Sequence, residues 1–414
     1  MRLSNANILT VTAVLLPPVA LIVPLGVAPL LGATILAIVV ARLRSDDGFG
    51  VFRSVPAFLL GLFLLWAATS LLWTPEFLRG TRSVAKLVLI FAGGILAIDS
   101  AWKLAPAERR RCGTALVIGV TVTFIYLAVD IYSNGIIRGA FLKALGHDGF
   151  QRHVLNRPVS IVVLLLWPAL IVVKYRYPAW AVWLCLVLAI GLLAGSENTT
   201  ALVALTAGAL VYSMASISKF LPALRFVSAA GIVVSVLALP LFSGMSDKIE
   251  SWNALSGVEN SFVHRLYIWD FAASRALEKP AMGWGIDAVR GLARHIKPQG
   301  VPSGTETPIE ARRRFFKANR LPLHPHSAGL QIWVELGVIG VILFGGFLGW
   351  LCWCAGNRTQ FGAASPALLA LIVTGFAISS SGFGIWQSWW MSSIWLTAIL
   401  TFAVTPTLHA LEHR

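Results

Sequence analysis

The chain is poor in charged residues and in cysteine, and each shortage excludes a class of protein. Only 12% of its 414 residues are charged, whereas 57% are hydrophobic and the mean hydropathy is +0.77. A water-soluble core of this length could not hide so much apolar surface, which excludes a soluble globular fold. The four cysteines lie in or beside apolar runs, so we expect neither a disulfide framework nor a zinc site. They are Cys112, Cys185, Cys352 and Cys354.

Apolar runs long enough to cross a bilayer recur along the whole sequence. A spanning helix needs roughly 17 to 25 such residues, and the alternation typical of a membrane β-barrel is missing. The sequence therefore predicts an all-α polytopic membrane protein with about 12 transmembrane helices. They are expected near 8–23, 26–41, 55–74, 84–101, 113–132, 158–173, 178–194, 200–217, 224–243, 328–354, 364–381 and 388–408. The first two are read as spans rather than as a signal peptide.

Basic residues fall in every second loop, which indicates how the chain is oriented. Short loops that carry Arg and Lys stay in the cytoplasm, and this rule places both termini there. The loop residues are Arg42, Arg44, Arg53, Lys103, Arg109, Arg110, Arg111, Lys174, Arg176, Lys219 and Arg358. Because the net charge of +15 is spread over these loops and one long one, membrane lipids and phosphate are expected partners and nucleic acid is not.

This orientation divides the chain into three parts. Helices one to nine occupy residues 1–243, a large periplasmic loop occupies 244–325, and helices ten to twelve occupy 326–414. The loop is expected to contain two short amphipathic helices. In the first, Phe262, Leu266, Trp269 and Ala273 form a stripe at helical spacing, and the second follows a glycine turn in MGWGIDAVRGLARHI. The run KPQGVPSGTET is typical of an excursion over a site.

Three short elements near the end of this loop resemble one family. His326 is followed by Ser327, then by Gly337 and Gly340. Upstream, Arg265 stands four residues before Trp269, and PAMGWG supplies a glycine turn. These spacings resemble the signature of the O-antigen ligase and polymerase superfamily, in which His, a small polar residue, nine variable positions and Gly mark the mouth of a late helix. The resemblance covers about residues 260–340.

The resemblance implies a glycosyltransferase of the bacterial inner membrane with its active site facing the periplasm. An O-antigen ligase joins undecaprenyl diphosphate-linked O-antigen to the lipid A core oligosaccharide during lipopolysaccharide biosynthesis, without cofactor or metal. An O-antigen polymerase would use the same donor, but the single late loop and the His-Ser element favour the ligase. A lipid-linked glycan transporter is the alternative from another class, and it would place ionisable residues at matching midplane positions in two halves.

A diphosphate-linked donor requires cations near the periplasmic surface. Arginine presents a planar fork that matches phosphate oxygens, and Arg265 is our first candidate. Arg79, Arg82 and Lys86 depart from the basic-inside pattern, and an early start of their helix would place them on one face. Further candidates precede the histidine, at Arg320 and in the run Arg312 to Arg314, although this run favours unselective lipid binding.

His326 precedes a helix and has several possible tasks. It can act as general base toward an acceptor hydroxyl, contact the diphosphate, or simply cap the helix. His324 and His326 stand two positions apart, and the sequence offers no third candidate ligand near them. A metal site is therefore not expected. Glu335 should be buried against a neighbouring polar group rather than form a dyad with His326.

Two further features are open to a simple interpretation. The turn GSENTTAL carries Glu197 and Asn198 where related ligases often have an arginine, so Arg79 or Arg82 is expected to supply that charge. Tryptophans 386, 389 and 390 are expected to anchor the protein at the membrane interface.

Overall fold

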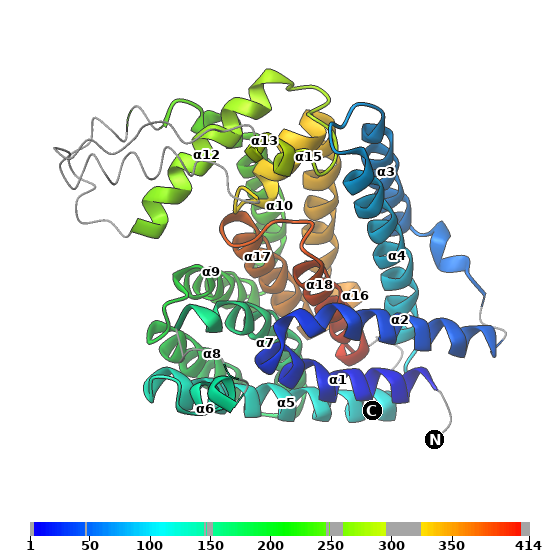
Figure 1. The fold of residues 1–414 in the computed structure, drawn as a ribbon. Coiled ribbons are helices and arrows are strands. Elements are labelled where there is room, and N and C mark those ends of the chain that lie inside the picture. The colour runs from blue at the N-terminus through cyan, green and yellow to red at the C-terminus, as the bar shows by residue number, and fades with distance from the viewer. Residues whose placement is uncertain are drawn as a thin grey trace.

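The secondary structure of the described residues is helical. The computed structural model describes residues 4–45, 48–144, 146, 152–245, 248, 260–294 and 324–406, and no strand occurs among them. Within these ranges each apolar run expected from the sequence forms a helix (Figure 1). The helices are α1 (Asn5–Ile22), α2 (Val27–Leu43), α3 (Val55–Thr69), α4 (Phe77–Trp102), α5 (Pro106–Tyr132), α7 (Asn156–Arg176), α8 (Ala179–Ala194), α9 (Thr199–Ser216), α10 (Leu221–Leu237), α15 (Ala328–Ala355), α17 (Ser365–Ser381) and α18 (Ser388–Val404).

Among the described residues, 9 helices are long and apolar enough to cross a membrane, so the chain is a multi-pass membrane protein. Three other apolar helices, α8, α10 and α18, are shorter, with 16 or 17 residues. At about 1.5 Å of rise per residue, such a helix extends about 25 Å, less than a hydrocarbon core of about 30 Å. By this length criterion, nine of the twelve expected spans are supported, and the total of twelve stays a prediction.

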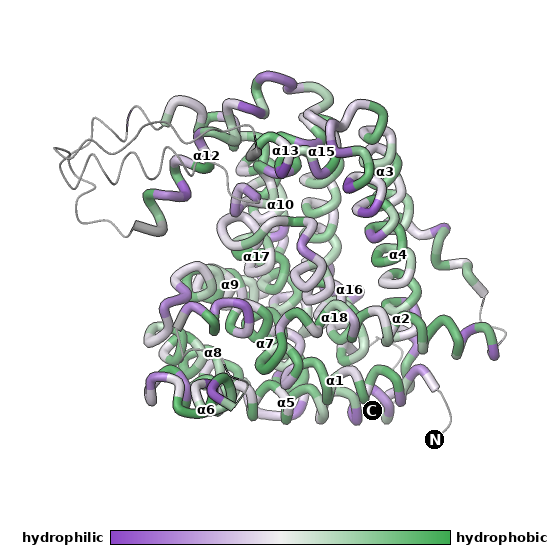
Figure 2. The backbone as a smooth tube through the Cα atoms, viewed as in Figure 1, coloured by the Kyte–Doolittle hydropathy of each residue, from purple (hydrophilic) through white to green (hydrophobic). Residues whose placement is uncertain are grey.

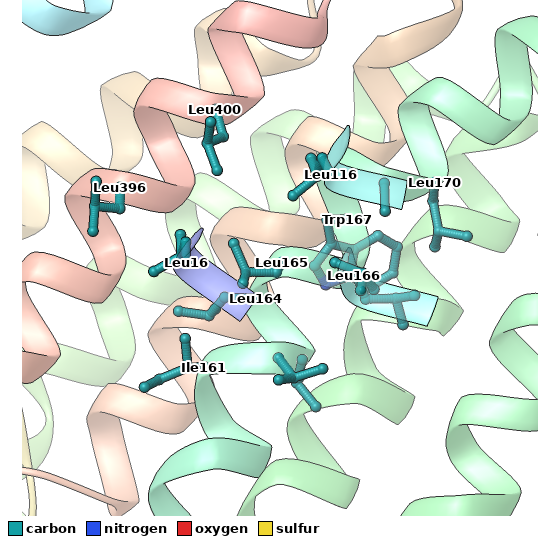
Figure 3. Close-up of a cluster of buried hydrophobic side chains, with 14 of the residues drawn as sticks. Leu16, Leu116, Ile161, Leu164, Leu165, Leu166, Trp167, Leu170, Leu396 and Leu400 are labelled. Carbon is teal, nitrogen blue, oxygen red and sulfur yellow. The ribbon is translucent and has the colours of Figure 1, made fainter. Parts of the chain in front are cut away.

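Helix α7 forms the centre of the larger hydrophobic core. Every residue from Pro158 to Val173 is buried, and the helix packs against α1, α5, α17 and α18. Figure 3 shows Leu164, Leu165 and Trp167 of α7 among leucines from α1, α5 and α18. By contrast, Leu36 and Leu89 are 65% and 72% exposed, and Figure 2 shows that hydrophobic residues occupy much of each long helix. These side chains are suited to lipid.

At one end of the molecule, basic side chains bond groups on the ends of neighbouring helices. The buried guanidinium of Arg42 lies 2.7 Å from the Asp99 carboxylate, and the Arg109 guanidinium donates to the carbonyls of Phe402 and Thr405. Arg111 donates to Asn7 in α1. The start of α1 and the end of α18 therefore lie beside the loops that the sequence identified as basic. That this end faces the cytoplasm stays a prediction.

The backbone of α15 is broken at Gly337. This residue has φ +61° and ψ −165°, so the regular helical hydrogen bonds are lost around it. In their place, the N–H of Trp284 donates to the Val334 carbonyl (2.7 Å), and the N–H of Val338 donates to the Pro280 carbonyl (2.8 Å). The Glu335 carbonyl accepts from the N–H of Gly285 (2.8 Å), and the Leu336 carbonyl accepts from Trp66 Nε1 (2.9 Å). These bonds satisfy backbone groups that lipid could not.

Two glycines allow the segment of residues 280–285 to approach the break this closely. A Cβ on Gly337 would lie 2.4 Å from the Ala281 carbonyl oxygen, and a Cβ on Gly283 would lie 2.5 Å from the Glu335 carbonyl oxygen. Both residues have φ values near +65°, in the region that favours glycine. The PAMGWG turn and the glycine that follows His326 by eleven positions are thus two sides of one contact.

Some expected boundaries were wrong. α4 begins at Phe77 instead of residue 84, and α10 ends at Leu237 instead of 243. The helix α6 (Ile136–Ala144) was not expected, because a carboxylate that caps its start belongs to another helix. Asp130 in the preceding helix α5 accepts from the N–H groups of Ile137 and Arg138.

The two loop helices are α12 (Asn260–Glu278) and α13 (Val289–Arg294), and the short α16 (Arg358–Phe361) precedes α17. In α12 the expected stripe is only partly correct, because Phe262 is 45% exposed whereas Ala273 is buried.

Replacing Gly337 with alanine should destabilise the fold. The added Cβ overlaps the Ala281 carbonyl, and alanine at this φ is strained, so we expect a loss of about 2 kcal/mol or more. Thermal unfolding in detergent measures the effect. Gly346→Ala on the same helix is the matched control, because its Cβ meets nothing within 4 Å. Equal melting temperatures for the two variants would contradict the role assigned to Gly337.

Candidate active site

The connection between α17 and α18, residues 382–387, links two parts of the candidate site. Lys86 Nζ in α4 donates to the Trp386 carbonyl (2.6 Å). The N–H of Ile385 donates to Gln331 Oε1 in α15 (3.0 Å), and His326 Nδ1 lies 2.9 Å from the Gly382 carbonyl oxygen. This six-residue connection therefore joins the cationic start of α4, through Trp386, to the histidine that precedes α15, through Gly382.

A pocket with a volume of about 240 Å³ lies at the start of α4. Four of its lining side chains are cationic, and one is a carboxylate. It is lined by Arg79, Arg82, Ser83, Lys86, Asp287, Arg290 and Trp386. Because α4 begins at Phe77, the spacing of three and then four residues places its three cations on one helical face, as the sequence predicted for an early start. The pocket therefore has the charge of an anion site.

Glu335 lies fully buried and joins three segments around the pocket. One of its carboxylate oxygens accepts from Trp386 Nε1 (2.5 Å) and from the N–H of Asp287 (2.8 Å). The other accepts from Gln331 Nε2 (3.1 Å). The prediction that Glu335 is buried against polar groups is confirmed. Its contacts hold α15, the Asp287 turn and the 382–387 connection in one arrangement.

The ring of His326 has a defined proton position. The Gly382 carbonyl can only accept, so Nδ1 carries the proton in the neutral ring and Nε2 keeps its lone pair. The backbone of His326 has φ +51°, a left-handed conformation that histidine adopts more readily than most residues. Ser327 follows as the N-cap of α15, with its hydroxyl accepting from the N–H of Leu330 (3.4 Å). Helix capping thus belongs to Ser327, and the His326 Nε2 is suited to accept a proton.

His324 lies against His326 and supports its backbone. Its Nδ1 accepts from the N–H of His326 (3.3 Å), and the two ring centroids are 4.3 Å apart. Burial lowers the pKa of His324 to about 3, with the charges of His326 and Arg290 acting in the same direction. Burial also lowers the pKa of His326 from 6.5; the Gly382 carbonyl opposes this shift, and Arg265 and His264 add to it. Both imidazoles are therefore neutral near pH 7.

Helix α12 brings Arg265 and Trp269 to this region. Trp269 Nε1 donates to the Pro325 carbonyl (3.1 Å), directly before His326. Arg265 Nη1 donates to Thr200 Oγ1 (3.2 Å) at the start of α9. The arginine that contacts this turn therefore comes from α12, whereas Arg79 and Arg82, which were expected to replace it, line the pocket. Asp270 accepts from the N–H groups of Gly244 and Met245, so α12 holds both ends of the long loop.

The structure brings together most of the residues that the sequence singled out. Arg79, Arg82 and Lys86 line the pocket, and Arg265 and Trp269 lie beside the His326 segment. Gly340 supports the break in α15, since a Cβ there would lie 2.3 Å from the Leu336 Cβ. Arg320 and the run of residues 312–314 lie outside the described residues.

Sequence reasoning missed Asp287 and Arg290, and it misassigned the tryptophans. Asp287 follows the PAMGWG turn by two positions, and Arg290 comes three residues later. This closeness to the turn was the only signal in the sequence that could have pointed to them. Tryptophans 386, 389 and 390 are at most 5% exposed, so the expectation of interface anchoring was wrong. They are buried between helices, where Trp386 bonds Glu335 and Trp390 donates to Ser379 Oγ.

Comparisons with known proteins point to one superfamily. Residues 183–345, which include the elements that carry Arg265 and His326, match the family model described as O-antigen ligase. Among similar proteins that carry the provisional name polysaccharide ligase, one from Rickettsia conorii is 25% identical over 357 residues, 84% of this chain and 79% of that protein. Others from Rickettsia felis and Rickettsia typhi are 24% and 23% identical, over 84% and 89% of this chain and 80% and 85% of theirs. These matches support a relationship between the chain and the O-antigen ligase superfamily.

Proposed function

We propose that the chain is an O-antigen ligase that transfers O-antigen from undecaprenyl diphosphate to the lipid A core oligosaccharide. One observation carries this proposal: a pocket with four cationic side chains is linked by six residues to a histidine whose Nε2 is unprotonated. A diphosphate leaving group needs cations, and an acceptor hydroxyl needs a base. The site offers both.

The reaction follows from these positions. Arg79, Arg82 and Lys86 hold the diphosphate, and Arg265 lies on the His326 side, where the sugar is expected. His326 Nε2 takes the proton of the acceptor hydroxyl while its oxygen bonds to the anomeric carbon. The bond from that carbon to the diphosphate breaks, and the lipid diphosphate leaves with the electron pair. Attack from the opposite face inverts the anomeric configuration, and no step calls on a metal or a nucleotide.

The surface of α4 suits a polyprenyl chain. Phe77, Leu78 and Leu89 are 58%, 73% and 72% exposed, and the first two directly precede Arg79. A lipid that lies along these side chains can place its diphosphate in the pocket. Because burial of each methylene contributes about 0.8 kcal/mol, the lipid tail would supply much of the donor's affinity.

The location of the pocket supports a periplasmic reaction. Arg79 and Asp99 lie about 30 Å apart along α4 at about 1.5 Å per residue, which is close to the thickness of a hydrocarbon core. If the basic end with Arg42 and Asp99 faces the cytoplasm, the pocket faces the periplasm. The division into 1–243, 244–325 and 326–414 is part of this proposal.

Substitutions at the base and at the pocket should have different kinetic effects. His326→Asn keeps a residue that tolerates positive φ but removes the base, so kcat should fall by about 100-fold or more. Arg82→Gln should mainly raise the donor KM, by about tenfold or more. Transfer is measured in proteoliposomes with an undecaprenyl diphosphate-linked glycan, lipid A core and EDTA.

Arg44→Gln is the matched control for Arg82, because Arg44 is exposed beyond α2 at the basic end of the molecule. It should leave both constants unchanged. Glycan that lengthens on the lipid carrier, with lipid A core unmodified, would identify a polymerase instead. Wild-type activity in His326→Asn would contradict the assigned base, and loss of all transfer in EDTA would contradict a metal-independent reaction.

The pH dependence should report the lowered pKa of His326. The neutral ring is the active form, so activity is present above this pKa and is lost as the pH falls through it. Because burial lowers the pKa, the midpoint of the acidic limb of kcat/KM should lie below 6.5. Arg265→Gln removes a nearby positive charge and should shift that midpoint upward. A wild-type midpoint above 6.5 would rule out His326 in this environment as the titrating base.

A further inference from the structure

One carboxylate lies among the cations of the pocket. Asp287 is 8% exposed; its Oδ2 accepts from Ser83 Oγ (2.7 Å), and its Oδ1 lies 3.7 Å from Arg290 Nε. A negative charge at this place opposes the binding of a phosphate, because like charges repel strongly where water is scarce. Anion binding alone therefore gives no reason for an acidic residue here.

The carboxylate is held in place from several sides. Asp287 has φ +63°, and its N–H donates to the buried Glu335 (2.8 Å). The preceding residue, Ile286, is bonded through its N–H to Ser70 Oγ and through its carbonyl to Thr74 Oγ1. With the backbone fixed and Ser83 bonded to the side chain, the charge cannot simply swing out of the pocket when an anion enters.

We infer that Asp287 weakens the hold of the pocket on the diphosphate and thereby speeds release of the lipid diphosphate product. This inference rests on the proposed function. In the empty pocket the carboxylate offsets the mutual repulsion of the four cations, and in the occupied pocket it repels the anion. The product is repelled more than the donor, because its freed terminal phosphate ionises again with a pKa of about 6.

Asp287→Asn isolates the charge. Asparagine has nearly the same shape, tolerates a left-handed backbone, and can still accept from Ser83 through its side-chain oxygen. Undecaprenyl diphosphate should bind this variant about tenfold more tightly than wild type, by a margin that shrinks as salt is added. In steady-state transfer, kcat should fall, and added undecaprenyl diphosphate should inhibit more strongly. Binding is measured by titration of the full chain in nanodiscs.

Two further variants complete the test. Asp287→Gly removes the carboxylate with a residue that adopts φ +63° without strain, so it should also tighten binding even if the asparagine variant folds poorly. Glu278→Gln is the matched control, because this acid is the last residue of α12 and pairs with Arg275 at the surface, outside the pocket lining. It should bind undecaprenyl diphosphate as wild type does.

The outcomes separate this inference from the proposed function. If wild type binds undecaprenyl diphosphate and the folded Asp287 variants bind it equally or more weakly, the role in release is overturned while the diphosphate pocket stands. If neither wild type nor any variant binds it, the pocket itself is wrong, and the role falls with it. Tighter binding in both Asp287 variants and unchanged binding in Glu278→Gln support the inference.

Discussion

The site depends on one constraint: a helix broken inside a membrane must find new partners for its backbone groups. At Gly337 the partners come from the segment of residues 280–285 and from Trp66. Because water cannot satisfy these groups in hydrocarbon, the segment is held against α15. The same contact places Asp287 against Glu335, and Glu335 in turn holds Trp386. A backbone requirement thereby determines where the side chains of the pocket lie.

The two ends of α4 use their charges differently. At one end Arg42 and Lys103 lie 2.7 and 2.9 Å from the Asp99 carboxylate, and Arg109 donates to carbonyls. At the other end the ion pairs are longer, 3.7 Å for Arg79 with Glu76 and 3.7 Å for Arg290 with Asp287. The first arrangement ties helix ends together, since close pairs offset the cost of burying charge. The second leaves cationic groups directed toward a pocket, where an incoming phosphate can replace water.

Hydropathy located the helices well but not their surroundings. A run of twenty apolar residues is equally favourable against lipid and against protein. The sequence of the buried helix α7 therefore looks like that of a helix whose side chains, such as Leu89, are exposed. The tryptophans after Gly384 show the same limit, because an interface and a protein interior both suit their rings. The start of α4 was misplaced because Arg79 and Arg82 interrupt the apolar run ahead of residue 84, although they belong to the helix.

The sequence alone determined the all-α class, the order of the apolar helices and the short motifs around Arg265, His326 and Gly337. These follow from composition and from spacings within one segment, which local chemistry decides. Only the tertiary structure decided which cations share a pocket, which tautomer His326 adopts and why Asp287 and Arg290 belong to the site. Each of these depends on contacts between residues up to 300 positions apart, such as Lys86 with Trp386, and no local pattern records which distant groups satisfy one another.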